Sequence, residues 1–584
     1  MSTPHADGPL YLGFDLSTQQ LKAIIVDSQL KTVAQAKADF DDDFGKKYGI
    51  HKGVHVRPAS GEVIAPVAMW LEALDLVLSR LSATATASVM GRIRAVSGAG
   101  QQHGSVFWNS RAAECLRGLD PKRGGLVDQL PAALAHDVSP NWQDQSTQAE
   151  CDAFDAALGG RQRLAERFTG TQIMRLRRIL PEMYKKTAHI SLVSSWLASV
   201  LLGALAPLDV SDVCGMNLWD MNEQRYSKEL LALAAGGDGK PADDLRAKLG
   251  EPLPDGGASL GSISPYFVAR YGFNTKCEII PFTGDNPATI LALPLRPLDA
   301  IVSLGTSTTF LMNTPNYRPD GSYHFFNHPT TAGHYMFMLC YKNGGLAREK
   351  VRDNLKLQSD NGDAQQPRPS AQVDHNREWD AFNQAVLETP PLDMSKTGDR
   401  AKMGLYFPLR ETVPNIRPGT WRFTCMPDGS DLQPVSEPWA TATDPRIITE
   451  SQALSMRLRS KNLVHSPRDG LPAQPRRIYL VGGGSHNPAI ARVLGDVLGG
   501  ADGIYKLDVG GSACALGGAY KALWALEREP NQTFDDLIAA RWKEEGAVER
   551  IGDSYRPETY AKYGDVLGAF EAMEQHLLAE EKRD

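Results

Sequence analysis

The sequence predicts an α/β protein with more than one domain. Its 584 residues exceed the roughly 100–200 that one domain usually holds. Short apolar runs typical of strands alternate with segments of helical spacing, as in residues 477–481 and 488–498. Such alternation favours a mostly parallel sheet covered by helices. A strand–loop–strand pattern at residues 10–26 recurs at residues 300–312, which suggests two related halves.

Composition and charge exclude several classes of function. Lys and Arg number 62 against 69 Asp and Glu, and the net charge of −7 is spread along the chain. A nucleic-acid partner is therefore not expected, because such partners require a concentrated basic surface. The seven cysteines are odd in number and include no C-x-x-C pair, and no signal-like segment follows Met1. These features predict a reducing, cytoplasmic setting.

One uncharged stretch, residues 190–207, is almost long enough to span a bilayer. It contains four serines and then Gly203 and Pro207. We interpret it as a buried helix over about residues 194–202 that ends at Gly203, and we expect no membrane partner.

Both predicted hairpins carry small polar residues at their tips. These are Asp15, Ser17 and Thr18 in the first loop and Gly305, Thr306 and Ser307 in the second. Backbone N–H groups and short hydroxyl side chains fit phosphate oxygens, and Asp15 could hold Mg²⁺ directly or through water. Either loop alone could be an ordinary turn, but the pair favours phosphoryl transfer, which requires mainly positioning and charge stabilisation.

A third loop, residues 482–487, lies between a predicted strand and a predicted helix. Its glycines would let a ligand approach the backbone, and the helix N-terminus attracts negative charge. The loop matches neither the dinucleotide fingerprint nor the P-loop. Asn487 is a good N-cap for a helix with Pro488 in its first turn and Gly499 at its end, so Asn487 could also be a cap and nothing more.

Two further side chains follow predicted strands, where ligands of α/β sheets gather. Asp285 lies between Gly284 and Asn286 and could accept a proton from an attacking hydroxyl group. The alternative is a turn residue that caps a helix beginning near Pro287. His103 lies in a glycine-rich loop and could contact a ligand or serve the fold alone.

Together these segments resemble the FGGY family of carbohydrate kinases, most of all the xylulose kinases of eukaryotic, fungal type. The matching motifs occur in the family's order and comprise residues 15–18, 100–104, 284–287, 305–307 and 482–488, with longer stretches at 211–218, 341–349 and 513–521. The resemblance covers essentially the whole chain. It implies two ribonuclease-H-like domains of the actin-like ATPase fold around a central cleft. Residues 1–293 would bind the sugar and carry the catalytic base, and residues 294–584 would bind ATP.

The resemblance also implies the reaction and the residues that serve it. ATP, with Mg²⁺, would phosphorylate D-xylulose to D-xylulose 5-phosphate, which feeds the pentose phosphate pathway, and Asp285 would be the base. The implied sugar contacts are His103, Arg167, Asp285 and Asn286, with Gln102 and Asp144 nearby. The implied nucleotide contacts are Gly483, Gly484, Asn487 and Trp379 for the adenosine, and Gly305, Thr306, Ser307, Ser17 and Thr18 for the phosphates, with Asp15 for the metal. A monomer or a homodimer is expected.

The chain departs from the family pattern at one place. The segment before Arg167 lacks a Thr-Gly-Ser-containing turn that similar kinases carry, and residues 156–160 run almost directly into residues 164–167. This leaves open a catalytically weak, sugar-binding regulatory protein. A kinase for another ketopentose or polyol, such as ribulose, gluconate or glycerol, is a second alternative, and a chaperone-like ATPase on the same fold is a third.

Overall fold

The computed structural model describes residues 8–84, 87–158, 168–293, 295–360, 379–507, 511–545, 547–552 and 555–581. The chain forms two compact units. Unit 1 comprises Met1–Leu295, Phe325–Met336 and Val509–Trp542, and unit 2 comprises Arg296–His324, Phe337–Asp508 and Lys543–Asp584. The first change of unit thus follows Leu295, and two later segments return to unit 1. The predicted division at residues 293 and 294, with sugar assigned to one part and ATP to the other, stays a prediction.

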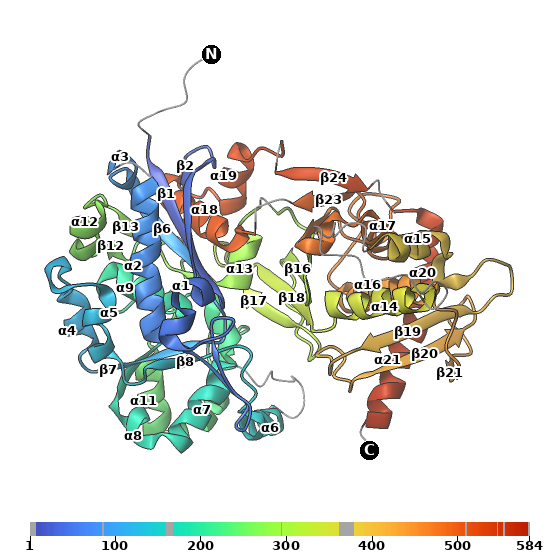
Figure 1. Ribbon diagram of the computed structural model, residues 1–584, viewed down its shortest axis with the longest axis horizontal. Coiled ribbons are helices and arrows are strands. Elements are labelled where there is room, and N and C mark those ends of the chain that lie inside the picture. The colour runs from blue at the N-terminus through green and yellow to red at the C-terminus, as the bar shows by residue number, and fades with distance from the viewer. Residues whose placement is uncertain are drawn as a thin grey trace, which may run out of the picture. The chain divides into compact units, whose positions relative to one another are not determined.

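Unit 1 is built on a seven-stranded sheet (Figure 1). Its strands, in spatial order, are β12 (Gly261–Ser262), β13 (Glu278–Ile279), β6 (Ile93–Gly100), β1 (Leu10–Leu16), β2 (Gln20–Asp27) and β3 (Thr32–Asp39), with β14 (Thr283–Gly284) also paired to β6. β6 runs parallel to β1, β13 and β14, whereas β2 and β3 are antiparallel to their neighbours. The sheet is mixed, so the expectation of a mostly parallel sheet is wrong. The reason is that an apolar pattern in the sequence locates a strand but does not give its direction.

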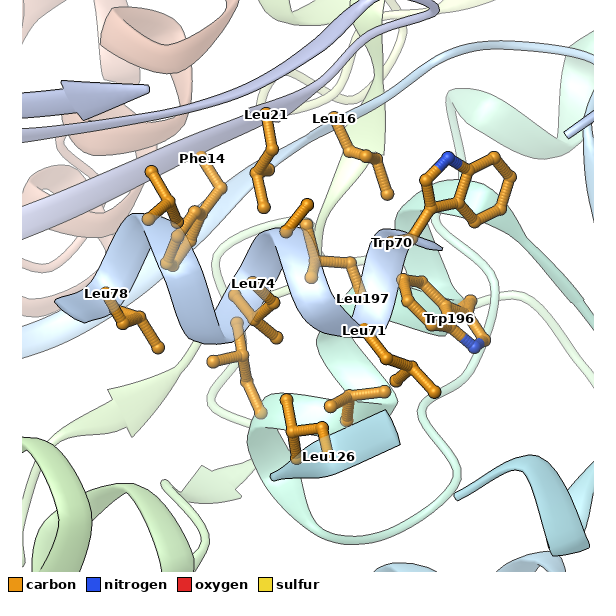
Figure 2. Packing of buried hydrophobic residues seen from close by; sticks show 14 of the residues in the cluster. Phe14, Leu16, Leu21, Trp70, Leu71, Leu74, Leu78, Leu126, Trp196 and Leu197 are labelled. Carbon is orange, nitrogen blue, oxygen red and sulfur yellow. The ribbon is translucent and has the colours of Figure 1, made fainter. Parts of the chain in front are cut away.

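The alternation of side chains along β1 assigns its two faces to different helices. Leu10, Leu12, Phe14 and Leu16 belong to the cluster that contains α2 (Val67–Thr84) and α9 (Val193–Leu202). Figure 2 shows α2 presenting Trp70, Leu71, Leu74 and Leu78 to this cluster, with Phe14, Leu16 and Leu21 from the strands on one side and Trp196 and Leu197 of α9 close by. The rings of Trp70 and Trp196 lie 5.6 Å apart between centroids. This core includes Leu16 at the carboxyl end of β1, so it stabilises the edge of the sheet at which Asp15 lies.

The opposite face of the sheet is covered by α18 (Ala513–Glu527), a segment near the end of the chain. In Figure 1 this red helix lies beside the blue strands β1 and β6. The approach is so close that a Cβ added at Gly13 would lie 1.9 Å from the Ala515 carbonyl oxygen, and one at Gly518 would lie 2.6 Å from the Gly98 Cα. These glycines permit backbone-to-backbone packing that no side chain would allow.

The uncharged stretch at residues 190–207 forms α9, which is buried and ends at Gly203 with φ of 75°. The prediction of a buried helix ended by this glycine is confirmed. Within the described part of the chain, no helix has the length and apolar character needed to cross a membrane.

Unit 2 contains a second mixed sheet and a smaller antiparallel one. The larger sheet includes, in spatial order, β18 (Tyr335–Tyr341), β16 (Thr308–Thr314), β15 (Ala300–Leu304), β22 (Ile478–Val481), β23 (Ile504–Leu507) and β24 (Val548–Gly552). β15 is antiparallel to β16 and parallel to β22. The smaller sheet comprises β19 (Ala401–Phe407), β20 (Gly419–Cys425) and β21 (Gln433–Val435).

Helices cover these sheets and lie beside the loop of residues 482–487, which is named the glycine loop. They include α14 (Gly345–Asp360), α15 (Asp380–Glu388), α16 (Asp444–Ser460) and α17 (Pro488–Leu498). The predicted cap is confirmed: the Asn487 side chain accepts hydrogen bonds from the N–H groups of Ala489 and Ile490, Pro488 occupies the first turn, and Gly499 ends α17.

Candidate active site

Strand register brings two of the predicted acidic residues to the same edge of the unit 1 sheet. Asp15 of β1 is opposite Ala99 of β6, and Gly284 of β14 is opposite Gly100 of β6. Because β1, β6 and β14 run parallel, their carboxyl ends meet at one edge. Asp15 and Asp285 therefore lie on the two sides of the end of β6.

Asp285 is the first residue of α13 (Asp285–Ile290), so this helix begins two residues earlier than Pro287. Its Oδ1 accepts hydrogen bonds from the backbone N–H of Asn286 at 2.8 Å and from Asn286 Nδ2 at 3.1 Å. Burial raises the pKa of Asp285 to about 7, and the negative charge of Asp15 adds to the rise. A half-buried carboxylate that gains a proton near neutral pH has the property required of a general base.

Asp15 is 5% exposed, and burial raises its pKa to about 6. One of its oxygens accepts a hydrogen bond from Ser17 Oγ at 3.2 Å. The other, Oδ1, is buried and has no hydrogen-bond partner among the described residues. A carboxylate oxygen buried without a donor is costly, and a cation would offset that cost.

The residues present fit Mg²⁺ in one particular way. Among the residues that the structure describes, no group of three or more His, Cys, Asp and Glu side chains is arranged to hold a metal ion. Mg²⁺ is commonly held by one or two carboxylates together with substrate phosphates and water. Asp15, with its unsatisfied oxygen, fits that mode of binding.

The glycine-rich loop after β6 carries Gln102 and His103, and Gln102 lies beside Asp285. Asn286 Nδ2 donates to Gln102 Oε1 at 3.0 Å, which joins the two loops. His103 adopts a φ of 71°, its Nδ1 donates to the Gly215 carbonyl oxygen at 3.0 Å, and its ring stacks on Phe168 with centroids 4.2 Å apart. The structure thus brings Asp15, Gln102, Asp285 and Asn286 together, with His103 next in the chain after Gln102, and their roles stay predictions.

The other predicted residues of unit 1 have different settings. Asp144 is 2% exposed, and its carboxylate accepts four hydrogen bonds, from the Val63 N–H, the Ser146 N–H and hydroxyl, and Gln172 Nε2. These contacts stabilise the turn that carries Trp142. They also occupy both oxygens of the Asp144 carboxylate with hydrogen bonds from the protein. Arg167, with the shortened segment before it, lies outside the described residues.

Thr18 ties the first hairpin loop to its neighbours. Its hydroxyl donates to Gln101 Oε1 at 3.2 Å and accepts a hydrogen bond from the Trp142 indole N–H at 2.8 Å. Asn141 Nδ2 donates to the same Gln101 oxygen at 2.7 Å. The loops after β1 and β6 are therefore cross-linked by side chains, which fixes the positions of Ser17 and Thr18.

The site contains one acidic residue to which the sequence assigned no role. Asp212 is 2% exposed and begins the short helix η3 (Asp212–Met216). Burial raises its pKa to about 7, with nearby Asp209 and Asp285 adding to the rise. Asp212 lies in the motif at residues 211–218, but its proximity to Asp285 depends on contacts between distant segments that local patterns do not reveal.

In unit 2, the second hairpin loop is exposed at the end of β15. Gly305, Thr306 and Ser307 connect β15 to β16, and all three are exposed. The carbonyl oxygens of Gly305 and Thr306 accept hydrogen bonds from the N–H groups of Gly345 and Leu346 at the start of α14, at 3.0 and 3.1 Å. The loop is thereby anchored from one side.

The glycine loop follows the neighbouring parallel strand, β22, so it lies beside the hairpin loop. A Cβ added at Gly484 would lie 2.8 Å from Leu304 Cβ, whereas one added at Gly483 would have no heavy atom within 4 Å. Gly483 is exposed. The backbone at residue 483 is therefore open to a ligand, while residue 484 is packed against the end of β15.

Trp379 and Asn487 are joined through α15. Asn487 Nδ2 donates to Asn383 Oδ1 at 2.6 Å, and Asn383 lies one turn after Trp379, the residue that precedes α15. The Trp379 ring packs edge-on against Phe382, at 5.2 Å between centroids, and the Arg352 guanidinium lies 4.7 Å from its centroid. Unit 2 thus gathers the predicted adenosine contacts around the glycine loop and the start of α15.

Comparisons with known proteins give a consistent result. Residues 300–526 match the model of the FGGY family of carbohydrate kinases, C-terminal domain. A probable D-xylulose kinase A from Aspergillus fumigatus is 56% identical over 585 aligned residues, which cover 99% of each chain. D-xylulose kinase A from Aspergillus niger is 55% identical over 98% of this chain and 99% of its own.

The fold is also found in a solved structure. A xyloylose kinase from Brucella ovis superposes with a TM-score of 0.72 at 18% identity, over 98% of this chain and 99% of that one. At this level of identity the likeness establishes a shared fold, which includes the two mixed sheets.

Proposed function

The chain belongs to the FGGY family of carbohydrate kinases, and we propose that it transfers the γ-phosphate of ATP to D-xylulose, giving D-xylulose 5-phosphate and ADP. The observation that carries this proposal is the similarity to D-xylulose kinases, which exceeds half of all positions and extends over nearly the full length of both chains. The cluster around Asp285 supports it, because it supplies the base that the transfer requires.

Asp285 is the proposed general base. It takes the proton of the terminal hydroxyl group as that oxygen attacks the γ-phosphorus, and the bond to the β-phosphate oxygen breaks to release ADP. Both hydrogen bonds from Asn286 go to Oδ1, and Oδ2 is the oxygen proposed to take the hydroxyl proton. With a pKa of about 7, Asp285 is poised between its two protonation states near neutral pH.

The proposed sugar contacts surround this base. His103, Gln102 and Asn286 lie in the two loops joined by the Asn286–Gln102 hydrogen bond and offer donors and acceptors for the ketose hydroxyl groups. Arg167 is proposed as a further contact from its place in the family motif. Asp144, with its oxygens saturated, would support the site by holding its turn.

ATP is proposed to bind mainly through residues of unit 2. Gly483, Gly484, Asn487 and Trp379 would contact the adenosine, and the small residues Gly305, Thr306, Ser307, Ser17 and Thr18 would offer donors to the phosphates. Mg²⁺, when bound, would neutralise phosphate charge, and Asp15 would hold it directly or through water. A cytoplasmic location and a monomeric or homodimeric state stay predictions.

The test is an ADP-release assay with the purified protein and a panel of sugars. We expect ADP release that depends on D-xylulose and is much slower with D-ribulose, L-ribulose, gluconate and glycerol. Fastest release with another sugar would reassign the substrate within the family. Binding of D-xylulose without turnover would indicate a regulatory protein, and ADP release that no sugar alters would overturn the proposal.

A further inference from the structure

We propose that Asp212 is a positioning residue for the phosphoryl transfer, which it serves by fixing the side-chain amide of Gln102 and, through it, Asn286 and Asp285. This inference rests on the proposed function, because it concerns the orientation of the proposed base. Asp212 would touch neither substrate nor metal, and it would act through a chain of hydrogen bonds.

The contacts of Asp212 come from three separate segments. Its Oδ2 accepts a hydrogen bond from Ser194 Oγ of α9 at 2.5 Å, and its Oδ1 accepts one from Gln102 Nε2 at 3.4 Å. Its own N–H donates to Asp209 Oδ1 at 3.1 Å. The carboxylate is therefore held from both sides, and its second oxygen is directed at the loop that carries Gln102.

Asp209 anchors the turn from which Asp212 projects. It is fully buried, accepts a hydrogen bond from Thr283 Oγ1 at 2.6 Å, and pairs with the buried Lys521 Nζ of α18 at 3.1 Å. Thr283 is two residues before Asp285 on the strand that leads to it. The turn and the base are thus fastened to the same buried ion pair, which limits their relative movement.

A side-chain amide has a donor end and an acceptor end, so the contacts of Asp212 orient the amide of Gln102 and, through it, that of Asn286. Asp212 Oδ1 accepts a hydrogen bond when the carboxyl group is ionised and also when the proton is on Oδ2, so it selects the donor end of the Gln102 amide. The acceptor end, Gln102 Oε1, is then presented to Asn286 Nδ2 at 3.0 Å. Asn286 Nδ2 also donates to Asp285 Oδ1 at 3.1 Å. Both ends of the Gln102 amide and the Nδ2 end of the Asn286 amide are therefore hydrogen-bonded within the site. The Oδ1 of Asn286 is then the end that can accept a bond from a sugar hydroxyl group.

Packing leaves little room for a second arrangement. A Cβ added at Gly284 would lie 2.6 Å from Gln102 Cγ and 2.7 Å from Asp212 Oδ1. Both side chains therefore press against the backbone of the residue that directly precedes the base. Without the Asp212 carboxylate, the Gln102 amide would lose one of the two partners that distinguish its ends, and only Asn286 Nδ2 would oppose a flip.

The experiment compares Asp212→Ala, Asp212→Asn and Gln102→Met with the wild type by steady-state kinetics on D-xylulose and ATP. We expect Asp212→Ala to lower kcat about 10- to 100-fold and to raise KM for D-xylulose, with KM for ATP within about twofold of wild type. Asp212→Asn should recover most of that loss, because its Oδ1 can accept from Gln102 while its Nδ2 donates to Ser194. The double variant Asp212→Ala/Gln102→Met should be little worse than either single variant.

Several results would overturn the inference. They are equal kinetics for wild type and Asp212→Ala, additive effects in the double variant, or an Asp212→Asn variant as impaired as Asp212→Ala. If Asp212→Ala does not fold, Asp212→Ser replaces it: its shorter side chain loses the contact with the Gln102 amide, so kcat should fall as for Asp212→Ala, and kinetics equal to wild type would overturn the inference. Asp220→Ala, which removes another carboxylate from a turn of unit 1, is the matched control and should leave kcat and KM unchanged. A wild type that releases no ADP with any sugar refutes the proposed function, and the positioning role falls with it.

Discussion

Strands β1, β2 and β6 of unit 1 are arranged as strands β15, β16 and β22 are in unit 2. In each unit an antiparallel hairpin lies beside a parallel strand, and a loop follows each of the two parallel strands at the same edge. The chemistry of the two edges differs. The unit 1 edge carries carboxylates whose pKa values are raised by burial, whereas the unit 2 edge carries exposed glycine and hydroxyl residues.

This difference indicates that one backbone arrangement serves two tasks through its side chains. In unit 1, buried carboxylates joined by amides suit proton transfer and metal binding. In unit 2, bare backbone suits close contact with a nucleotide. If this division is correct, substitutions at the first edge should change the rate of the chemical step, and substitutions at the second should change the binding of ATP.

The largest expected effect is at Asp285. Asp285→Asn should lower kcat at least about 100-fold, since a positioned general base typically contributes about 10²–10⁴-fold. ATP binding, followed by calorimetry on the variant, should stay within about twofold of wild type. Near-full turnover would remove Asp285 from its role, and a large loss of ATP affinity would break the contrast between the two edges.

The second effect is a dependence on pH. Burial raises the pKa of Asp285 to about 7, and a base acts only when ionised, so kcat/KM for D-xylulose should fall about tenfold per pH unit below 7. A flat profile between pH 5 and 8, measured where the protein stays folded, would contradict this expectation.

The third effect is at Asp15. Asp15→Asn removes the charge but keeps the shape, and it should lower kcat about tenfold and raise the Mg²⁺ concentration that gives half the maximal rate. Titration of the rate with Mg²⁺ at saturating ATP and sugar measures both. An unchanged Mg²⁺ requirement would show that the unpartnered Asp15 oxygen has another purpose.

The smallest effect is at the glycine loop of unit 2. Gly483→Ala places a methyl group in open space, so it should leave the melting temperature unchanged while raising KM for ATP about three- to tenfold. KM for D-xylulose should not change. Gly484→Ala is the matched control, because its methyl group would press on Leu304 and should lower the melting temperature. An unaltered KM for ATP in Gly483→Ala would remove this residue from the nucleotide site.

Local features of the fold were predictable from sequence. The helix that begins after Asn487 and the buried helix that ends at Gly203 both follow from caps and spacing within a few residues. The hairpins β1–β2 and β15–β16 were predictable too, because each joins strands that are adjacent in sequence. The direction of strands whose pairing partners are distant in sequence was not predictable. For the same reason the position of Asp212 beside Gln102 could not be read from either segment alone.

The site was predictable in outline and less so in detail. Asp285, Gln102 and Asn286 lie together as expected, since each follows a strand of one sheet. Asp144 shows the limit: its sequence context cannot reveal that Val63, Ser146 and Gln172 occupy its oxygens. Saturation of a side chain by its neighbours depends on tertiary contacts.

Helix α18 has a consequence for how the protein is made. During synthesis the ribosome releases the strands of unit 1 long before residues 513–527, which cover one face of those strands. Until then Tyr11, Ile24 and Val26 have no Leu523 or Trp524 to pack against, and the growing chain carries an uncovered apolar surface. The apolar core of unit 1 can therefore be completed only after most of unit 2 has left the ribosome. A nascent chain halted near residue 293 should depend on chaperones for this reason.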